Sequence, residues 1–421
     1  MFALVDCNNF YASCEKLFRP DLKHTPVVVL SNNDGCIVAR SREAKKLGFK
    51  MGMPYFQAKE MIDRNGVEVF SSNYELYADI SRRVMETLES ITPAIEIYSI
   101  DEAFIDLSGM DTNFELLAFG QMIRDTVVKH TGISVGVGIA QTKTLAKLAN
   151  NAAKTYPKTG GVVVLTDKTR QEKLMKITPV GEVWGVGRCI SSQLETMGIK
   201  TVWDFVQYDT VSIRKQFSVV LERTQRELTG YPCFALDETP ATKQQIVCSR
   251  SFGDRITSLE HLSEAINSYT ARACTKLRIE GVSAKQLTVF CRTSPFADKE
   301  PYYSNSASVE LAYPSDNTSD FLPLASQLIT QLFKPNYRYA KAGVMLSDFY
   351  APGTFQLGLF DEQPKDNAQS KALMTTLDQL NKKQRNTVYF ASEGIAKPWA
   401  MKRGKMSPQY TTRWDELPII G

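Results

Sequence analysis

YSIDEAFIDL, residues Tyr98–Leu107, places two adjacent acids, Asp101 and Glu102, between two runs of apolar, β-prone residues. IEIYSI before the acids and AFIDLSG after them predict the two arms of a β-hairpin. Another acid, Asp6, ends the apolar run FALVD near the start of the chain. Because each acid follows residues typical of a strand, both segments can lie on one sheet, and the three carboxylates can then lie together.

Carboxylates on neighbouring strands are typical of sites that bind Mg²⁺. This hard ion prefers oxygen ligands, usually a few carboxylates together with substrate phosphates and water. Two such ions, about 3.5 to 4 Å apart, stabilise both the attacking and the leaving oxygens of phosphoryl or nucleotidyl transfer. Acids at a hairpin turn are more often simply solvated, and Asp106 in the same stretch fits that simpler role.

The surrounding segments alternate between β-rich and helical patterns. PVVVLSN and CIVAR predict strands on either side of the turn-like SNNDG, and SREAKKLGF predicts a helix that ends at Gly48. ISVGVGIAQ predicts a strand that leads directly into the helix TKTLAKLANNAAK. Two hairpin-like regions with interleaved helices favour an α+β fold with a small, mainly antiparallel sheet over a doubly wound parallel sheet.

The second half of the chain predicts further modules. A mostly helical stretch runs from about residue 167 to 231, and CFALDETPATK within 232–243 has the composition of a linker. Beyond it, the helical SLEHLSEAINSYTARACTKLRIEG and the β-like QLTVFCR, SASVELAY and KAGVMLSDF predict a second small α/β module. The segment from Ala351 onward has weak periodicity, and we expect it to be only partly ordered.

Composition excludes several classes of protein. The 421 residues contain no apolar run long enough for a membrane helix and no signal peptide, so we expect a cytoplasmic protein without membrane contact. Eight scattered cysteines and three histidines suggest neither a zinc site nor a disulfide framework. The net charge of +4 is too small to indicate nucleic-acid binding by itself.

Five stretches, in their order and spacing, resemble the Y-family of translesion DNA polymerases, nearest to the catalytic subunits of bacterial DNA polymerase V. They are FALVDCNNFYASCE, SNNDGCIVARSREAKKLG, YSIDEAF, GVGIAQTKTLAKLAN and VWGVGRCISSQLETMGIKTVWDF. The resemblance covers essentially the whole chain. It implies an α+β right-hand polymerase with palm, fingers and helical thumb, together with a little-finger module and a partly ordered C-terminal tail.

The same resemblance implies domain boundaries. They are 1–20 and 80–166 for the palm, 21–79 for the fingers, 167–231 for the thumb with its helix-hairpin-helix, 232–243 for the linker, 244–350 for the little finger, and 351–421 for a clamp-binding peptide and partner-binding tail.

Roles at the active centre also follow from the resemblance. Asp6, Asp101 and Glu102 would be the catalytic carboxylates and would bind two Mg²⁺ ions together with the backbone carbonyl of Cys7. Tyr11 would lie beneath the sugar of the incoming deoxynucleoside triphosphate, where a ribose 2′-hydroxyl would clash. The implied nucleotide-binding cations are Arg42, Lys45 and Lys154, although many relatives carry a tyrosine at the position of Arg42.

The implied partners are primer-template DNA, the sliding clamp, a processed UmuD-type dimer and RecA. Gly185 and Gly187, in the helix-hairpin-helix, would present backbone amides to DNA phosphates. Candidate DNA contacts of the little finger are Arg250, Arg255 and Lys285. The segment FQLGLF resembles a clamp-docking pentapeptide through Gln356, Leu357, Leu359 and Phe360.

The activity implied is that of a DNA-directed DNA polymerase, which performs error-prone translesion synthesis in the SOS response. A non-catalytic adaptor that binds DNA and clamp is the first alternative, but an adaptor would not need the three carboxylates. A nucleotide cyclase is the second, because its catalytic sheet can resemble a palm and also uses two metals. The thumb-like and little-finger-like modules and the clamp-like peptide have no place in a cyclase.

Overall fold

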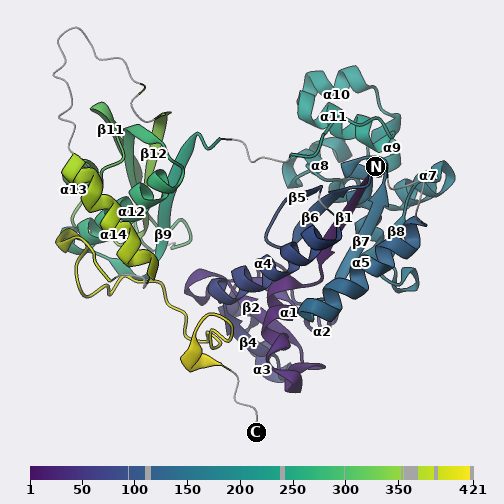
Figure 1. The fold of residues 1–421 in the computed structure, drawn as a ribbon, viewed down its shortest axis with the longest axis horizontal. Helices are drawn as coiled ribbons and strands as arrows, with labels where there is room; N and C mark the ends of the chain where they lie inside the picture. Colours follow the sequence, from purple (N-terminus) through teal and green to yellow (C-terminus); the bar gives the residue numbers. More distant parts are fainter. Residues whose placement is uncertain are drawn as a thin grey trace. The chain divides into compact units, whose positions relative to one another are not determined.

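The computed structural model describes residues 1–92, 94–109, 115–237, 242–297, 299–351, 354, 368–383 and 387–417. The chain divides into two compact units, and Figure 1 labels most of their elements. The first unit contains residues 1–31, 35–240 and 405–421, and the second contains residues 32–34 and 241–404. Each unit is described by itself below.

A mixed sheet in the order β5-β6-β1-β7-β8 forms the centre of the first unit. β1 pairs antiparallel with both β6 and β7, β5 pairs antiparallel with β6, and only β8 runs parallel to its neighbour. The mainly antiparallel sheet and the hairpin around YSIDEAFIDL are therefore confirmed. The strands are β1 (Phe2–Cys7), β5 (Ile95–Ile97), β6 (Glu102–Asp106), β7 (Val135–Ala140) and β8 (Val162–Val164).

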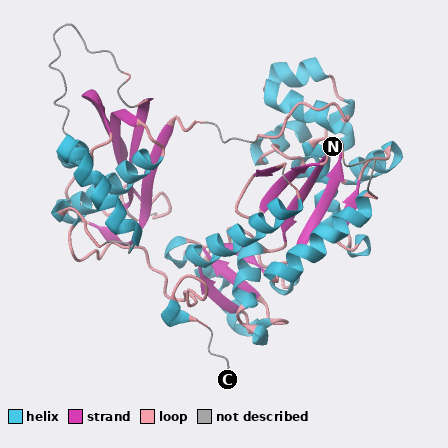
Figure 2. Cartoon of the chain, viewed as in Figure 1, coloured by secondary structure: helices cyan, strands magenta, loops and turns pink. Residues whose placement is uncertain are grey.

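Helices cover both faces of this sheet, so β1 is buried along its whole length (Figure 2). Ala3 and Val5 pack in one core with α4 (Tyr74–Ile91) and α5 (Leu116–Thr131). Phe2 and Leu4 pack in another core with α6 (Lys143–Thr155). Side chains alternate between the faces of a strand, so Asp6 falls on the face that α6 covers.

α6 lies unusually close to β7 because β7 carries Gly138. A Cβ atom at Gly138 would lie 2.3 Å from the backbone oxygen of Ala146 and 2.3 Å from the backbone nitrogen of Asn150. The buried Asn150 amide then donates to the carbonyl oxygens of Leu4 (3.2 Å) and Gly136 (2.8 Å). This contact fixes α6 against β1, which leads to Asp6, and against its neighbour β7.

Two smaller groups of elements complete the first unit. A three-stranded sheet in the order β3-β2-β4 packs with two short helices around its own apolar core. Five helices after β8 enclose the core that α6 shares with them. The elements are α1 (Phe10–Leu17), β2 (Val27–Leu30), β3 (Ile37–Arg40), α2 (Arg42–Lys46), α3 (Tyr55–Asn65), β4 (Glu68–Ser71), α7 (Lys168–Ile177), α8 (Arg188–Thr196), α9 (Val202–Gln207), α10 (Thr210–Gln216) and α11 (Val219–Leu228).

The second unit is an antiparallel sheet in the order β11-β10-β12-β9, with α12 and α13 packed against it. An ion pair joins Arg278 of α12 to Asp378 of α14, with nitrogen and oxygen 2.6 Å apart. The sequence patterns above do not predict β9, α13 or α14, and α13 contains Pro323, which obscures a helical pattern. The elements are β9 (Gln245–Ile256), α12 (Leu259–Ile279), β10 (Ser283–Thr293), β11 (Ser304–Ser315), α13 (Thr318–Leu332), β12 (Tyr339–Tyr350) and α14 (Ala368–Lys383).

Within the described residues, no helix combines the length and the apolar character that a membrane span requires.

We expect Gly138→Ala to destabilise the first unit, because the backbone atoms of α6 that the new methyl group meets can move only with the whole helix. Overpacking of this kind costs about 1 to 3 kcal/mol in the free energy of unfolding. Chemical denaturation followed by circular dichroism measures the loss. Gly187→Ala is the matched control, since a Cβ atom at Gly187 would meet no described atom within 4 Å; equal losses in the two variants would contradict the close-packing argument.

Candidate active site

The sheet brings the three predicted carboxylates to one end of β1 and β6. Asp6 lies directly opposite Glu102 in the antiparallel register. Immediately beyond, the backbone amide of Cys7 donates to the carbonyl oxygen of Asp101 at 2.8 Å. The end of β1 and the turn before β6 are thus tied together by backbone hydrogen bonds, which do not depend on the side chains.

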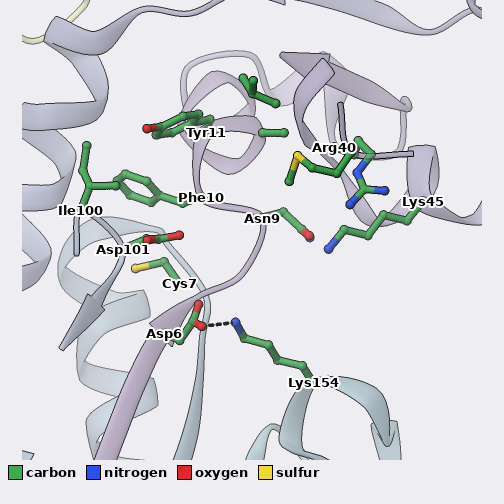
Figure 3. Close-up of a pocket in the computed structure, with 13 residues that line it drawn as sticks. Asp6, Cys7, Asn9, Phe10, Tyr11, Arg40, Lys45, Ile100, Asp101 and Lys154 are labelled. Carbon is green, nitrogen blue, oxygen red and sulfur yellow. Dashed lines mark ion pairs between the residues drawn. The ribbon is translucent and has the colours of Figure 1, made fainter. Parts of the chain in front are cut away.

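Asp6 is buried, with 8% of its surface exposed. Its Oδ2 lies 2.5 Å from Nζ of Lys154 on α6, and Figure 3 shows this ion pair at the edge of the pocket. Burial and the neighbouring Glu102 carboxyl nevertheless raise the pKa of Asp6 to about 7, although Lys154 opposes them. Asp6 and Glu102 are therefore close enough that both are readily ionised only with additional positive charge nearby.

Glu102 and Asp101 also have partners within the protein. Nζ of Lys147, again from α6, donates to both carboxylate oxygens of Glu102 at 2.9 and 2.8 Å. Burial opposes ionisation of Glu102, but hydrogen bonds from Asp6 and Lys147 outweigh it and lower the pKa of this carboxyl. The hydroxyl of Ser99 donates to Oδ1 of Asp101 at 2.7 Å.

The donor chemistry suits a hard divalent cation, since oxygen ligands from several carboxylates converge on one end of the sheet. In the described part of the chain, however, no three His, Cys, Asp or Glu side chains form a cluster that could hold a metal ion as they stand. Instead, the positive charge beside these carboxylates comes from α6: Lys154 pairs with Asp6, and Lys147 pairs with Glu102.

A cavity of about 340 Å³ opens beside Asp6 and Asp101. Figure 3 shows acidic groups along one side of it and the cations Arg40, Lys45 and Lys154 along the other. Burial, with the charges of Arg40 and Lys154, lowers the pKa of Lys45. Three cations that face one cavity form a site for an anion with several charges. The lining residues are Asp6, Cys7, Asn9, Phe10, Tyr11, Val38, Ala39, Arg40, Lys45, Met51, Ile100, Asp101 and Lys154.

Tyr11 forms an aromatic wall of this cavity. Its ring stacks on that of Tyr77 in α4, with 4.4 Å between the ring centroids and 16° between the ring planes. Asn9, just before α1, adopts a left-handed backbone conformation (φ 50°) that turns the chain from β1 into the helix. This sharp turn places Tyr11 within the same cavity as Asp6 and Cys7.

The remaining predicted residues lie elsewhere. Arg42 is exposed at the start of α2 and is not among the residues that line the cavity. Gly185, with φ 86°, and Gly187, the N-cap, immediately precede α8.

In the second unit, Arg250 and Arg255 are exposed on β9, while Lys285 pairs with Glu310 at 2.8 Å. The clamp-like residues lie outside the described part of the chain; they are Gln356, Leu357, Leu359 and Phe360.

The sequence prediction missed two basic residues of the site, Arg40 and Lys147. Arg40 ends β3 and reaches the cavity, while its NH1 donates to the carbonyl oxygen of Phe49 at 2.7 Å. Lys147 lies about two helical turns before Lys154 on α6, so both ammonium groups project toward the same end of the sheet. That spacing is visible in TKTLAKLANNAAK and could have identified Lys147.

Three family models match the chain. The impB/mucB/samB family matches residues 5–151, its C-terminal domain matches residues 243–359, and a domain of unknown function (DUF4113) matches residues 371–420. The Protein UmuC of Salmonella typhimurium is 54% identical over 99% of both chains. Protein ImpB from the same organism is 52% identical over 100% of this chain and 99% of its own.

Solved structures give the same result for the fold. A Y-family DNA polymerase chimera aligns with a TM-score of 0.66 at 21% identity, over 83% of this chain and 100% of the chimera. An insertion ternary complex of Dbh DNA polymerase aligns with a TM-score of 0.54 over the same shares. The expected right-hand polymerase fold and the resemblance to UmuC and its relatives are therefore confirmed.

We expect the acidic end of the sheet to bind a divalent cation through Asp101. Mn²⁺ binding, measured by the loss of the free-ion signal in electron paramagnetic resonance, should weaken at least tenfold in Asp101→Asn, because a neutral amide is a poor ligand for a hard cation. Asp106→Asn is the control, since Asp106 lies at the far end of β6, opposite Phe2. Equal Mn²⁺ affinity in both variants and the native chain would contradict the assignment of Asp101.

Proposed function

This chain belongs to the impB/mucB/samB family of Y-family DNA polymerases, and on that premise we propose that Asp6, Asp101 and Glu102 carry out its nucleotidyl transfer by a two-metal mechanism. The observation that supports this proposal most directly is the β1–β6 register, which sets Asp6, a lining residue of the cavity with three cations, directly opposite Glu102.

The protein is a DNA-directed DNA polymerase that performs error-prone translesion synthesis during SOS mutagenesis and DNA repair. DNA polymerase IV 2 of Bacillus subtilis is 27% identical to this chain, over 86% of this chain and 87% of that protein. Y-family polymerases act on primer-template DNA with deoxynucleoside triphosphates and divalent metal ions.

Asp6, Asp101, Glu102 and the backbone carbonyl of Cys7 would hold the two Mg²⁺ ions. When bound, the ions lower the pKa of the primer 3′-hydroxyl and neutralise the charge that develops on the triphosphate. The sheet holds Asp6 and Glu102 in position. To bind the ions, their carboxyl groups would therefore only have to release the ammonium groups of Lys154 and Lys147. Lys154, once released from Asp6, is free to contact a phosphate oxygen.

The cavity has the features that an incoming nucleotide requires. Arg40, Lys45 and Lys154 surround a space where a triphosphate would find three positive charges. The ring of Tyr11 lies across from them and would meet the sugar, which makes it the group that excludes a 2′-hydroxyl. Arg42 remains a predicted phosphate contact, while Arg40 is better placed for this role.

DNA would be held mainly through its backbone. The N-terminus of α8, which follows Gly185 and Gly187, can offer unpaired amides to phosphates. Exposed Arg250 and Arg255 on β9 can add charge contacts, whereas Lys285 would first have to leave Glu310. We also assign sliding-clamp docking to Gln356, Leu357, Leu359 and Phe360, and contacts with a processed UmuD-type dimer and RecA to the rest of 351–421.

Primer extension across an abasic site tests the catalytic assignment. The reaction contains Mg²⁺, clamp, the processed UmuD-type dimer, and RecA with ATP. Asp101→Asn should lower kcat by at least a thousandfold, because the reaction would lose a carboxylate ligand at the developing charge. Asp106→Asn should retain activity close to that of the native chain.

Two other outcomes would be informative. Equal extension by the native chain and by Asp101→Asn would contradict the assignment of Asp101. No extension by any variant, together with intact binding of DNA and clamp, would favour the non-catalytic adaptor.

A further inference from the structure

A short segment far along the chain packs close to the helices that support the cavity-lining Tyr11. Residues 405–413, here called the 405–413 strap, belong to the first unit, although the preceding residues belong to the second. The strap lies in the region matched by the domain of unknown function. It contacts the neighbourhood of α1 and α4, the two helices that carry Tyr11 and Tyr77.

Two contacts, one at Lys405 and one at Tyr410, attach the strap to the first unit. At its start, the amide of Ser71 at the end of β4 donates to the carbonyl oxygen of Lys405, and the amide of Lys405 donates to the hydroxyl of Ser71, both at 2.9 Å. At Tyr410, its ring stacks on Phe18, which follows α1, with 4.7 Å between centroids and 16° between planes.

Between these attachments, Asn73 joins the strap to the beginning of α4. Its Nδ2 donates to the carbonyl oxygen of Ser407 at 3.1 Å, to the hydroxyl of Ser407 at 3.0 Å and to the carbonyl oxygen of Pro408 at 3.2 Å. The other side of the same amide, Oδ1, caps α4 by accepting from the amide of Leu76 at 3.3 Å. One fully buried side chain therefore orients both the helix and the strap.

The hydroxyl of Ser407 also lies near Glu15 of α1, a carboxyl with no exposed surface. Its Oε1 accepts a hydrogen bond from the hydroxyl of Tyr77 at 2.5 Å. Burial raises the pKa of Glu15 to about 7, and Tyr77 and the nearby Ser407 hydroxyl favour the charged form. Among the described residues, its Oε2 has no hydrogen-bond partner at bonding distance, so burial of this carboxyl costs free energy that the hydrogen bond from Tyr77 offsets only in part.

Such a costly group needs a role other than stability, and its partner Tyr77 indicates one. The buried ring of Tyr77 stacks on Tyr11, which lines the nucleotide cavity. A stacked ring can still slide and rotate, but a hydrogen bond at the para position fixes it in its plane. The hydrogen bond to Glu15 thus fixes the surface on which Tyr11 rests.

We propose that the 405–413 strap and Glu15 are positioning elements for sugar selection: they hold Tyr77, and through it Tyr11, where the Tyr11 ring excludes a ribonucleotide. This inference rests on the proposed function, which makes Tyr11 the group that meets the sugar. It assigns part of the region matched by the domain of unknown function to the support of the polymerase active site.

The test compares kcat/KM for a deoxynucleotide with kcat/KM for the matching ribonucleotide, in full-length protein with all partners present. Tyr77→Phe keeps the stacked ring and removes the hydrogen bond to Glu15. Asn73→Asp keeps the oxygen that caps α4 and replaces the three donor contacts with a charge that repels the carbonyl groups of the strap. Glu15→Gln keeps an acceptor for Tyr77, and Thr412→Ala changes an exposed residue of the strap as a control.

Tyr77→Phe and Asn73→Asp should each lower the preference for deoxynucleotides by about three- to tenfold, the factor that corresponds to the net contribution of one hydrogen bond. The change should come from a higher kcat/KM for the ribonucleotide, with that for the deoxynucleotide nearly unchanged. Glu15→Gln and Thr412→Ala should keep the native preference.

Tyr11→Ala distinguishes a failure of the proposed role of Tyr11 from a failure of the proposed role of the strap. If Tyr11→Ala retains the native preference, the role of Tyr11 in the proposed function is wrong. If Tyr11→Ala loses the preference while Tyr77→Phe and Asn73→Asp keep it, the strap does not position Tyr11 and this inference is overturned. An equal fall in kcat/KM for both nucleotides in Tyr77→Phe and Asn73→Asp, with native near-ultraviolet circular dichroism, would also overturn it, because general damage does not distinguish between sugars.

Discussion

The antiparallel register of β1 against β6 is the constraint on which the active centre depends. It places Asp6 opposite Glu102 and leaves the amide of Cys7 to bond the carbonyl of Asp101. Because side chains alternate along a strand, a slip of one residue would turn Asp6 toward the core beneath α4 and α5. The apolar residues of β1, buried on both faces, make that slip costly, so burial far from the cavity determines where the acids lie.

Electrostatic balance is the second requirement, and α6 provides it. Lys147 and Lys154 stand on one side of this helix and neutralise Glu102 and Asp6. Their reach depends on how closely α6 approaches the sheet, which Gly138 permits and Asn150 fixes. For the proposed metal site, the same arrangement would let a cation replace the lysines without movement of the strands, since the carboxylates are attached to the sheet and the ammonium groups to long, flexible side chains.

The sequence was informative where local patterns determine structure. Apolar runs predicted β1, β6 and β7, and the position of each acid after its run predicted that Asp6, Asp101 and Glu102 would meet. Arg40 was missed because its role depends on which neighbours the fold supplies, whereas Lys147 could have been recognised from its spacing of seven residues from Lys154. The attachment of the 405–413 strap to α1 and α4 could not be predicted, because its hydrogen bonds join segments more than 330 residues apart and use ordinary Ser, Asn and Pro residues.

The strap also makes the first unit discontinuous along the chain. Helices α1 and α4 leave the ribosome long before Lys405 and Tyr410 have been synthesised, and during that time Glu15 and Phe18 lack their covering residues. Domains generally fold as units, N-terminal first during synthesis, so we expect this unit to close in two stages, with the strap docking only after the second unit has been synthesised. A protease that cuts between α14 and Lys405 would therefore separate the polymerase core from a part of its own structure, although Asp6, Asp101 and Glu102, the proposed catalytic carboxylates, would remain on the larger fragment.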